Sequence, residues 1–418
     1  MSLSLTAPAM AENVVDGNNV VTGGTATNPV KAVATKNLVM PVNTPTPDAT
    51  FTFELTKVSL NGSTAAGDLT TMPTIDAKTV TLSSSDNGST GDGAKTVSKE
   101  TTDILAGITW PHEGVYTYRV TEKQDTYTEK TGSPFSDDMA YSTAAYELTV
   151  YVYKDANGTF YAGALTTTLK AKDVASDVVD TKVDPTLGGK PSVAGDYSQM
   201  DWTNTYTRTD AGNATNPNLK VSKTVAGALG DTTRYFDFSV KVTNPVTVTA
   251  TDTVYKAYVV DSTGAKVTTA ANCGTGCEVD GNYEISFTTA TAENIKLKHG
   301  QSLVFVDTPV GTKVEVEEAA TADYTPSYVP TNLTSVKGGV IGANNTATVG
   351  QLLGLGTASA VYTASGSNVA AFTNTYKTVT ITGISANNLP YIVMIGLAVI
   401  GFAGYVVVRS RRRAKAEA

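Results

Sequence analysis

Most of the chain consists of short runs in which apolar and polar residues alternate. Clear examples are residues 51–55, 114–122, 146–153, 235–240 and 311–318, separated by turns rich in Gly, Asn and Asp. A period of two indicates β-strands with one buried face. The dipeptides Asn157-Gly158 and Asp280-Gly281 favour tight hairpins. The pattern therefore predicts an all-β fold with its strands arranged in sandwiches.

Two lysines break this pattern, because each lies on an otherwise apolar strand face. Lys223 shares its face with Leu219, Val221 and Val225, and Lys36 shares its face with Ala32, Ala34, Leu38 and Met40. A single lysine of this kind can reach water past the edge of a sheet. An unpaired buried ammonium costs several kcal/mol, so two lysines in matching contexts indicate a common cause.

The two lysines belong to an internal repeat. Each half of the chain has its lysine on the first strand, an inward glutamate near the middle and an inward asparagine between aromatic residues on the last strand. The matching sets are Lys36, Glu122 and Asn204 in the first half, and Lys223, Glu318 and Asn374 in the second. Glu315 and Glu317 adjoin the second set, but strand alternation selects Glu318 for the inward face.

A buried lysine, glutamate and asparagine that meet can react with one another. Burial in apolar surroundings lowers the pKa of a lysine and raises that of a glutamate. The neutral amine can then attack the carboxamide carbon, while the protonated carboxyl polarises the carbonyl and passes a proton to the departing ammonia. The product is a neutral Lys–Asn isopeptide bond, promoted by Glu122 in one half and by Glu318 in the other. The alternative is a hydrogen-bonded cluster that never reacts.

Composition narrows the classes of function. The 418 residues have a net charge of −8 and no basic cluster before the C-terminal tail, which argues against nucleic-acid binding. Cys273 and Cys277 lack the further ligands of a metal site and favour a small-loop disulfide in an exported domain. No Ser-His-Asp arrangement can be drawn with the two histidines, His112 and His299. We expect no metal, no cofactor and no enzymatic activity beyond the self-reaction.

Both ends of the chain carry signs of export. Residues 1–11 end in Ala9-Met10-Ala11, which matches the small-x-small rule of signal-peptide cleavage, and we interpret them as a signal-peptide remnant; an ordinary terminus is the alternative. Residues 389–408 are apolar or small throughout and long enough to span a bilayer. The basic tail, 409–418, places the C-terminus in the cytoplasm. The bulk of the chain is therefore expected outside the cell.

Together these features resemble the Gram-positive, sortase-assembled major pilins of the streptococcal type. The resemblance rests on the two Lys–Glu–Asn triads and on the runs GVYTYRVTE at 114–122, DWTN at 201–204, KHGQS at 298–302, TPVG at 308–311 and FTN at 372–374. It covers nearly the whole chain. It implies two tandem immunoglobulin-like β-sandwich domains, in which Lys36–Asn204 and Lys223–Asn374 bonds join the first and last strands. His299 then belongs to a structural turn.

The same resemblance implies a role for the C-terminal region. Val379, Thr380, Ile381, Thr382 and Gly383 look like a sortase signal cleaved between Thr382 and Gly383, although proline is missing at the second position, which leaves the sortase class open. In the family, a lysine shortly before the last strand of the first domain accepts the next subunit. Lys190 holds that place, with Lys182 and Lys172 as alternatives. Permanent membrane anchoring is the alternative to sorting.

The expected organisation follows from these features. It comprises a signal-peptide remnant (1–11), a linker (12–30), a first isopeptide sandwich (31–207), a connector (208–217), a second isopeptide sandwich (218–378), a sortase recognition region (379–388), a transmembrane helix (389–408) and a basic tail (409–418). The expected function is a structural pilus shaft subunit on the cell wall, with sortase, neighbouring subunits and peptidoglycan as partners. The alternative is a singly displayed adhesin that binds a host-surface ligand.

Overall fold

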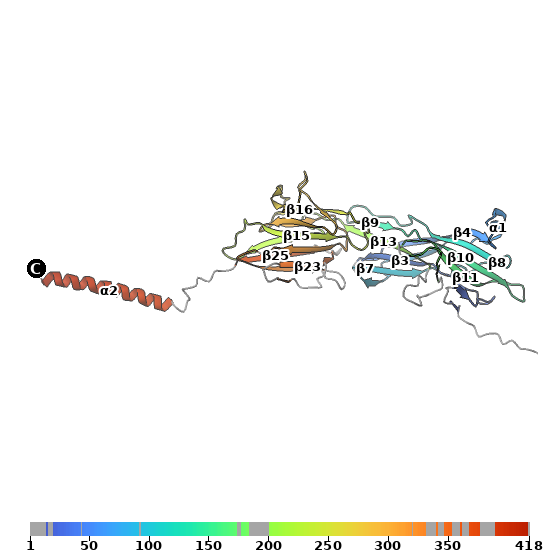
Figure 1. The fold of residues 1–418 in the computed structure, drawn as a ribbon, viewed down its shortest axis with the longest axis horizontal. Coiled ribbons are helices and arrows are strands. Elements are labelled where there is room, and N and C mark those ends of the chain that lie inside the picture. Colours follow the sequence, from blue (N-terminus) through green and yellow to red (C-terminus); the bar gives the residue numbers. More distant parts are fainter. Residues whose placement is uncertain are drawn as a thin grey trace, which may run out of the picture.

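The computed structural model describes residues 14–15, 20–42, 44–91, 93–173, 177–183, 200–319, 321–331, 340–341, 347–352, 360–361, 368–376 and 389–416. Strands dominate these residues, and the helices described are α1 (Ala66–Thr71), the 3₁₀ helix η1 (Ala270–Asn272) and α2 (Leu389–Ala416). The predicted all-β fold class is confirmed. Figure 1 shows two β-sandwiches in line along the long axis of the molecule, with α2 beyond the second.

The first domain packs two sheets face to face. One has the order β1 (Val14–Val15), β2 (Val20–Thr22), β11 (Phe160–Ala171), β10 (Ala145–Lys154), β8 (Gly114–Glu122), β4 (Ala49–Leu60) and β5 (Lys78–Leu82), with β12 (Lys182–Val183) also paired to β11. The other has the order β6 (Ser89–Gly91), β7 (Ala94–Glu100), β3 (Thr35–Pro41), β13 (Asp201–Asp210) and β9 (Phe135–Ala140). The predicted hairpin at Asn157-Gly158 joins β10 to β11.

The second domain repeats this arrangement with different strand lengths. One sheet has the order β17 (Ile285–Thr288), β16 (Val254–Val260), β19 (Ser302–Phe305), β14 (Leu219–Ala226), β25 (Asn368–Tyr376) and β21 (Tyr324–Thr331). The other has the order β18 (Ala292–Leu297), β15 (Phe236–Thr243), β20 (Lys313–Glu318), β23 (Ala347–Leu352) and β22 (Val340–Ile341), with β24 (Ala360–Val361) also paired to β20.

In each domain the strand that carries the lysine lies beside the strand that carries the asparagine. β3 pairs with β13, and β14 pairs with β25, and both pairs are parallel. Parallel neighbours cannot be joined by a tight hairpin, because the chain must return to the starting end of the sheet. Nearly a whole domain therefore lies between the two strands of each pair.

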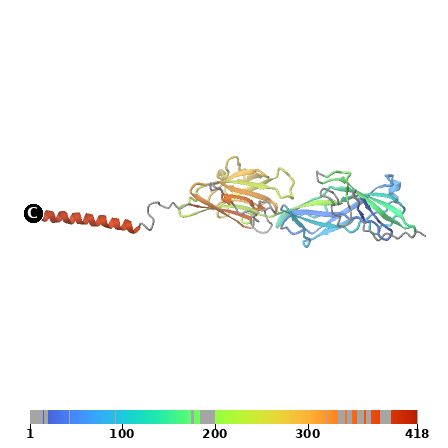
Figure 2. The ribbon, with the colours of Figure 1, turned by 60° about the horizontal axis from the view of Figure 1, so that its bottom comes forward.

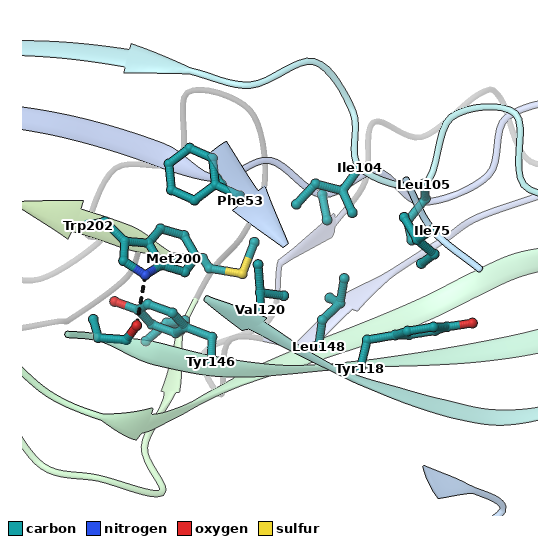
Figure 3. Packing of buried hydrophobic residues seen from close by; sticks show 14 of the residues in the cluster. Phe53, Ile75, Ile104, Leu105, Tyr118, Val120, Tyr146, Leu148, Met200 and Trp202 are labelled. Atoms are coloured by element: carbon teal, nitrogen blue, oxygen red, sulfur yellow. Dashed lines mark hydrogen bonds between the residues drawn. The ribbon is translucent and has the colours of Figure 1, made fainter. Parts of the chain in front are cut away.

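The core of the first domain is rich in aromatic side chains. Trp202 on β13 is fully buried, and its ring lies 4.8 Å from those of Phe53 and Tyr146, centroid to centroid. Figure 3 shows these three side chains together with Met200, and the dashed line marks the indole N–H of Trp202 donating to the carbonyl of Ala144. The aromatic cluster places β13 firmly against the opposite sheet.

The expected linker at residues 12–30 is wrong in part. Residues 20–22 form β2, which pairs with β11, and Val21 and Val30 are buried in the core of the first domain. The β-branched run Val20-Val21-Thr22 favours a strand, and it covers an edge of the larger sheet. This segment is thus part of the domain.

The helix α2 forms over the segment that was expected to cross the membrane. Its described apolar side chains between 393 and 408 are exposed. Searched over the described residues, the structure contains no helix with both the length and the apolar character needed to cross a membrane, so the predicted span at 389–408 is not confirmed.

The two sandwiches lie end to end, as the rotated view in Figure 2 also shows. Backbone hydrogen bonds join them. Val310 N–H donates to the carbonyl of Arg208 at 2.8 Å, and Gly212 N–H donates to that of Val306 at 3.2 Å. β13 runs to Asp210, so the expected connector at 208–217 begins inside a strand. Gly311 has a φ of +90°, and a Cβ there would lie 3.6 Å from Pro41 of the first domain and 3.1 Å from Pro245 of the second. The junction is therefore close-packed.

Candidate isopeptide sites

The first triad, Lys36, Glu122 and Asn204, meets in the core of the first domain. Lys36 Nζ lies 3.1 and 3.2 Å from the two carboxyl oxygens of Glu122 and also donates to the carbonyl of Trp202 at 3.1 Å. Asn204 Nδ2 donates to Glu122 Oε1 at 3.0 Å. The three residues are 0%, 4% and 0% exposed. The glutamate thus bridges the amine and the carboxamide.

The second triad, Lys223, Glu318 and Asn374, meets in the same way. Glu318 Oε1 lies 2.5 Å from Lys223 Nζ and accepts a hydrogen bond from Asn374 Nδ2 at 2.6 Å. All three side chains are buried. Glu318, the glutamate that strand alternation selected, is the one that meets the lysine and the asparagine, whereas Glu317 is exposed and Glu315 forms an ion pair with Lys241 on the outer face.

Strand register explains why the three side chains meet in both domains. Lys36 lies opposite Trp202 and Lys223 lies opposite Phe372, so in each case the asparagine lies two residues further along the neighbouring strand. Such diagonal neighbours share a face and lie within reach of long side chains. Each glutamate comes from the opposite sheet, where Glu122 pairs with Phe53 and Glu318 with Phe238. The triads are thus equivalent in position.

Burial brings the pKa of the lysine and the pKa of the glutamate in each triad closer together. Desolvation lowers the pKa of Lys36 and of Lys223 from 10.5 to about 8, against the opposing attraction of the glutamate. Desolvation likewise raises the pKa of Glu122 and of Glu318, although the lysine and the asparagine amide act in the other direction. Both shifts favour a neutral amine beside a protonated carboxyl, which is the reactive combination.

Aromatic rings line both lysines, a role that the sequence analysis did not assign. Lys36 Nζ lies 4.8 Å from the ring centroid of Phe51, and Lys223 Nζ lies 4.2 Å from that of Phe236. A ring face attracts an ammonium ion, but the same rings keep water away from the amine. The signal in the sequence was a Phe-x-Phe run in each half, at 51–53 and 236–238.

A polar residue in place of Phe236 should slow bond formation in the second domain. In Phe236→Ser, water reaches Lys223 and its pKa rises from about 8 toward 10.5. The neutral fraction at neutral pH then falls by roughly two orders of magnitude, because each pKa unit is a factor of ten. Phe236→Leu keeps the wall apolar and should retain the bond. Time-resolved peptide mass spectrometry checks both variants, with the first domain as internal control. A wild-type rate in Phe236→Ser would contradict the role of burial.

The remaining predicted residues fall into two groups. Cys273 and Cys277 form a disulfide, and His299 Nδ1 accepts from Val225 N–H at 2.9 Å, beside the second triad. Lys172 and Lys182 are exposed.

Outside the described residues lie Lys190, Val379, Thr380, Ile381, Thr382 and Gly383, together with the expected signal segment 1–11. Among the residues that the structure describes, no group of three or more His, Cys, Asp or Glu side chains is placed to hold a metal ion.

The two domains match two different protein-family models. Residues 32–207 match the family described as Spy0128-like isopeptide containing domain, and residues 217–351 match a domain of unknown function (DUF7601). A search of the curated proteins finds no match to this chain.

Solved structures with similarity to the chain include pilus proteins. A major pilin from Streptococcus pyogenes is 19% identical, with 84% of this chain and 99% of that chain covered and a TM-score of 0.29. The major pilin T3.2 from Streptococcus pyogenes is 17% identical over 83% and 98%, also with a TM-score of 0.29. A pilus-presented adhesin is 11% identical over 82% and 99%, with a TM-score of 0.25. These scores describe a loose superposition.

The family match and the triad geometry concern the same segment of the chain. Residues 32–207 contain the lysine, glutamate and asparagine of the first triad and the parallel strand pair that brings them together. The first domain is therefore similar to the Spy0128-like isopeptide containing domains, which agrees with the resemblance of this chain to the pilins of the streptococcal type.

Proposed function

We propose that the chain is a pilus shaft subunit stabilised by two self-formed Lys–Asn isopeptide bonds, Lys36–Asn204 and Lys223–Asn374. The observation that carries this proposal is the pair of buried triads, whose lysine and asparagine lie on the parallel neighbours β3 and β13 in the first domain and β14 and β25 in the second. The family match of residues 32–207 and the names of the similar pilus structures support it. The role is structural: the bonds form once and the protein turns over no substrate.

Bond formation starts from the neutral lysine and the protonated glutamate. The lone pair of Lys Nζ attacks the carboxamide carbon of the asparagine, and the carbonyl oxygen takes up the displaced electron pair. The glutamate gives its proton to the asparagine nitrogen and receives one from the lysine nitrogen. The carbonyl reforms as the bond to nitrogen breaks and ammonia leaves. The fold supplies the proximity that makes an unactivated amide reactive.

The rate of bond formation should be constant over a range of pH between the raised pKa of the glutamates and the lowered pKa of the lysines. The reactive pair, a neutral amine and a protonated acid, carries as many protons as the ion pair, so pH does not change their ratio. Above about 8 the pair loses a proton as the lysines titrate, and the rate falls. Below the raised pKa of the glutamates the pair gains a proton, and the rate falls again. A pH series of refolding unreacted protein, followed by mass, checks this. A rate that rises steadily to pH 10 would show that glutamate protonation is not required.

We further propose that sortase joins subunits through Thr382 and Lys190 and attaches the finished polymer to peptidoglycan at the cell surface. Wall extracts should then contain a ladder of covalent multimers. Lys190→Ala should abolish the ladder, because it removes the accepting amine, whereas Lys182→Ala and Lys172→Ala should leave it intact. Loss of the ladder in Lys182→Ala or Lys172→Ala instead would reassign the accepting lysine. Absence of any ladder from the wild type would overturn polymerisation.

The second candidate is a singly displayed adhesin. One observation favours it: a groove of about 420 Å³ on the outer face of β15, β18 and β20 of the second domain, covered at one side by the disulfide-closed loop at 273–277. Its walls include Asp237, Lys296 and Glu317. An adhesin would be attached to the wall as a single copy, so the multimer ladder separates the two functions.

A further inference from the structure

The two asparagine carboxamides have different surroundings. In the first domain Asn204 Oδ1 accepts a hydrogen bond from the backbone N–H of Ser142 at 2.8 Å, and both residues are buried. In the second domain Asn374 Oδ1 is buried without a hydrogen-bond partner among the residues described. In both domains the carboxamide nitrogen faces the glutamate. The first triad therefore has a hydrogen-bond donor at the carbonyl oxygen of its asparagine, while its glutamate contacts the carboxamide nitrogen.

Ser142 lies in the short segment 141–144 between β9 and β10, and this segment is held at several points. The Ser142 hydroxyl donates to Asp173, and Thr143 N–H donates to the same carboxylate at 2.6 Å. Gln124 Nε2 donates to the carbonyl of Ser142 at 2.9 Å and to that of Glu122 at 3.2 Å. The Trp202 indole donates to the carbonyl of Ala144. Side chains adjoining the triad thus fix the direction of the Ser142 N–H.

We propose that the Ser142 backbone N–H is the oxyanion donor for the first isopeptide bond, and that Asp173 positions it. This inference rests on the proposed formation of the Lys36–Asn204 bond and adds a group to it. Donors that are fixed before reaction at the point where negative charge develops need no reorganisation in the transition state. The buried site strengthens the effect, because water does not screen the hydrogen bond.

The Ser142 N–H and the Glu122 carboxyl act on different atoms of the reacting groups. When Lys36 Nζ attacks the carboxamide carbon of Asn204, the negative charge develops on Oδ1, which already accepts from Ser142 N–H. Glu122 contacts both nitrogens, so it takes a proton from Lys36 and gives one to Asn204 Nδ2, which departs as ammonia. The collapse restores the carbonyl and leaves the Ser142 hydrogen bond in place. Glu122 ends in the protonation state in which it began.

The decisive variant removes only the N–H. Replacement of Ser142 by its α-hydroxy acid analogue turns the amide into an ester in the full chain. Glu318→Gln in the same chain prevents the second bond, so the loss of ammonia reports the first bond alone. We expect this backbone change to slow the first bond roughly a hundredfold, the usual effect of removing one oxyanion donor. In the chain with Glu318 intact, the rate of the second bond should not change.

Side-chain variants test the positioning role of Asp173. Ser142→Ala keeps the N–H but removes the anchor to Asp173, and Asp173→Ala removes the anchor from the other side. Each should slow the first bond by roughly tenfold to a hundredfold, since small displacements from a reactive geometry have effects of this size. Ser142→Thr retains the hydroxyl and should restore a rate near that of the wild type.

Folding is measured separately in each variant. Tryptophan fluorescence reports whether the first domain has folded before the bond appears, since both tryptophans, Trp110 and Trp202, are buried in its core. A slow bond in a fully folded domain supports the proposal. The proposal is overturned if the ester variant forms the first bond at the wild-type rate. It is also overturned if the bond forms more slowly only in proportion to the fraction of the first domain that is unfolded. If the wild type itself never loses ammonia from the first domain, the proposed bond is wrong and the donor with it.

Discussion

The purified full chain is expected to weigh less than its sequence by the mass of two molecules of ammonia, in addition to the two hydrogens lost in the Cys273–Cys277 disulfide. Each triad releases one ammonia when its lysine condenses with its asparagine, and no other step in the proposed reaction changes the mass. Glu122→Gln should restore one ammonia and Glu318→Gln the other, because the amide cannot relay a proton between the two nitrogens. Intact-mass spectrometry of the three proteins measures this directly.

Matched controls lie on the same strand as Glu318. Glu315 pairs with Lys241 on the outer face and Glu317 is exposed, so Glu315→Gln and Glu317→Gln should both retain the full loss of mass. Peptide mapping should find Lys36 joined to Asn204 and Lys223 joined to Asn374. A measured mass without any loss of ammonia would show that both triads are unreacted hydrogen-bonded clusters. That result would refute the proposed cross-links.

Force applied between the two ends of the chain is expected to leave both domains almost unextended. About 170 residues separate Lys36 from Asn204 and about 150 separate Lys223 from Asn374, and each bond removes its segment from the load path. Without the first bond, the released segment would add roughly 550–600 Å of extended chain. Single-molecule pulling of Glu122→Gln and Glu318→Gln should each show one new unfolding step.

The attachment point decides which bond carries load. Lys190 precedes β13 and therefore lies on the same chain segment as Asn204, so a force between position 190 and the C-terminal end bypasses the first bond. In that geometry only Glu318→Gln should add a step. Unfolding steps in the wild type, or an extra step in Glu122→Gln pulled from position 190, would contradict the proposed linkage.

The same bonds should raise thermodynamic stability. By analogy with disulfides that close loops of more than a hundred residues, each bond contributes about 4–5 kcal/mol by restricting the unfolded chain. Denaturation of each Gln variant compared with the wild type measures this difference, with Glu317→Gln as the control that keeps both bonds. Loss of the cross-link should affect mainly the domain that carried it, because the two hydrophobic cores are separate clusters.

Much of this architecture could be predicted from local pattern. The period-two alternation predicted the strand at 114–122, which β8 reproduces in its bounds, and alternation also chose Glu318 over its neighbours. The short segment at 20–22 was missed because three residues give too little pattern to distinguish a strand from a linker. The aromatic lining by Phe51 and Phe236 was missed because a Phe-x-Phe run is equally typical of any buried strand.

By itself the sequence determined that two lysines, two glutamates and two asparagines face the interior of a β fold, since side-chain direction along a strand follows from the two-residue period alone. Which of them meet was decided by tertiary structure. The parallel pairing of β3 with β13 and of β14 with β25 depends on the packing of whole sheets, and it sets the two-residue offset that brings each amine to its carboxamide. The contact between Ser142 N–H and Asn204 likewise joins residues that no local pattern relates, because a backbone donor carries no mark in the sequence.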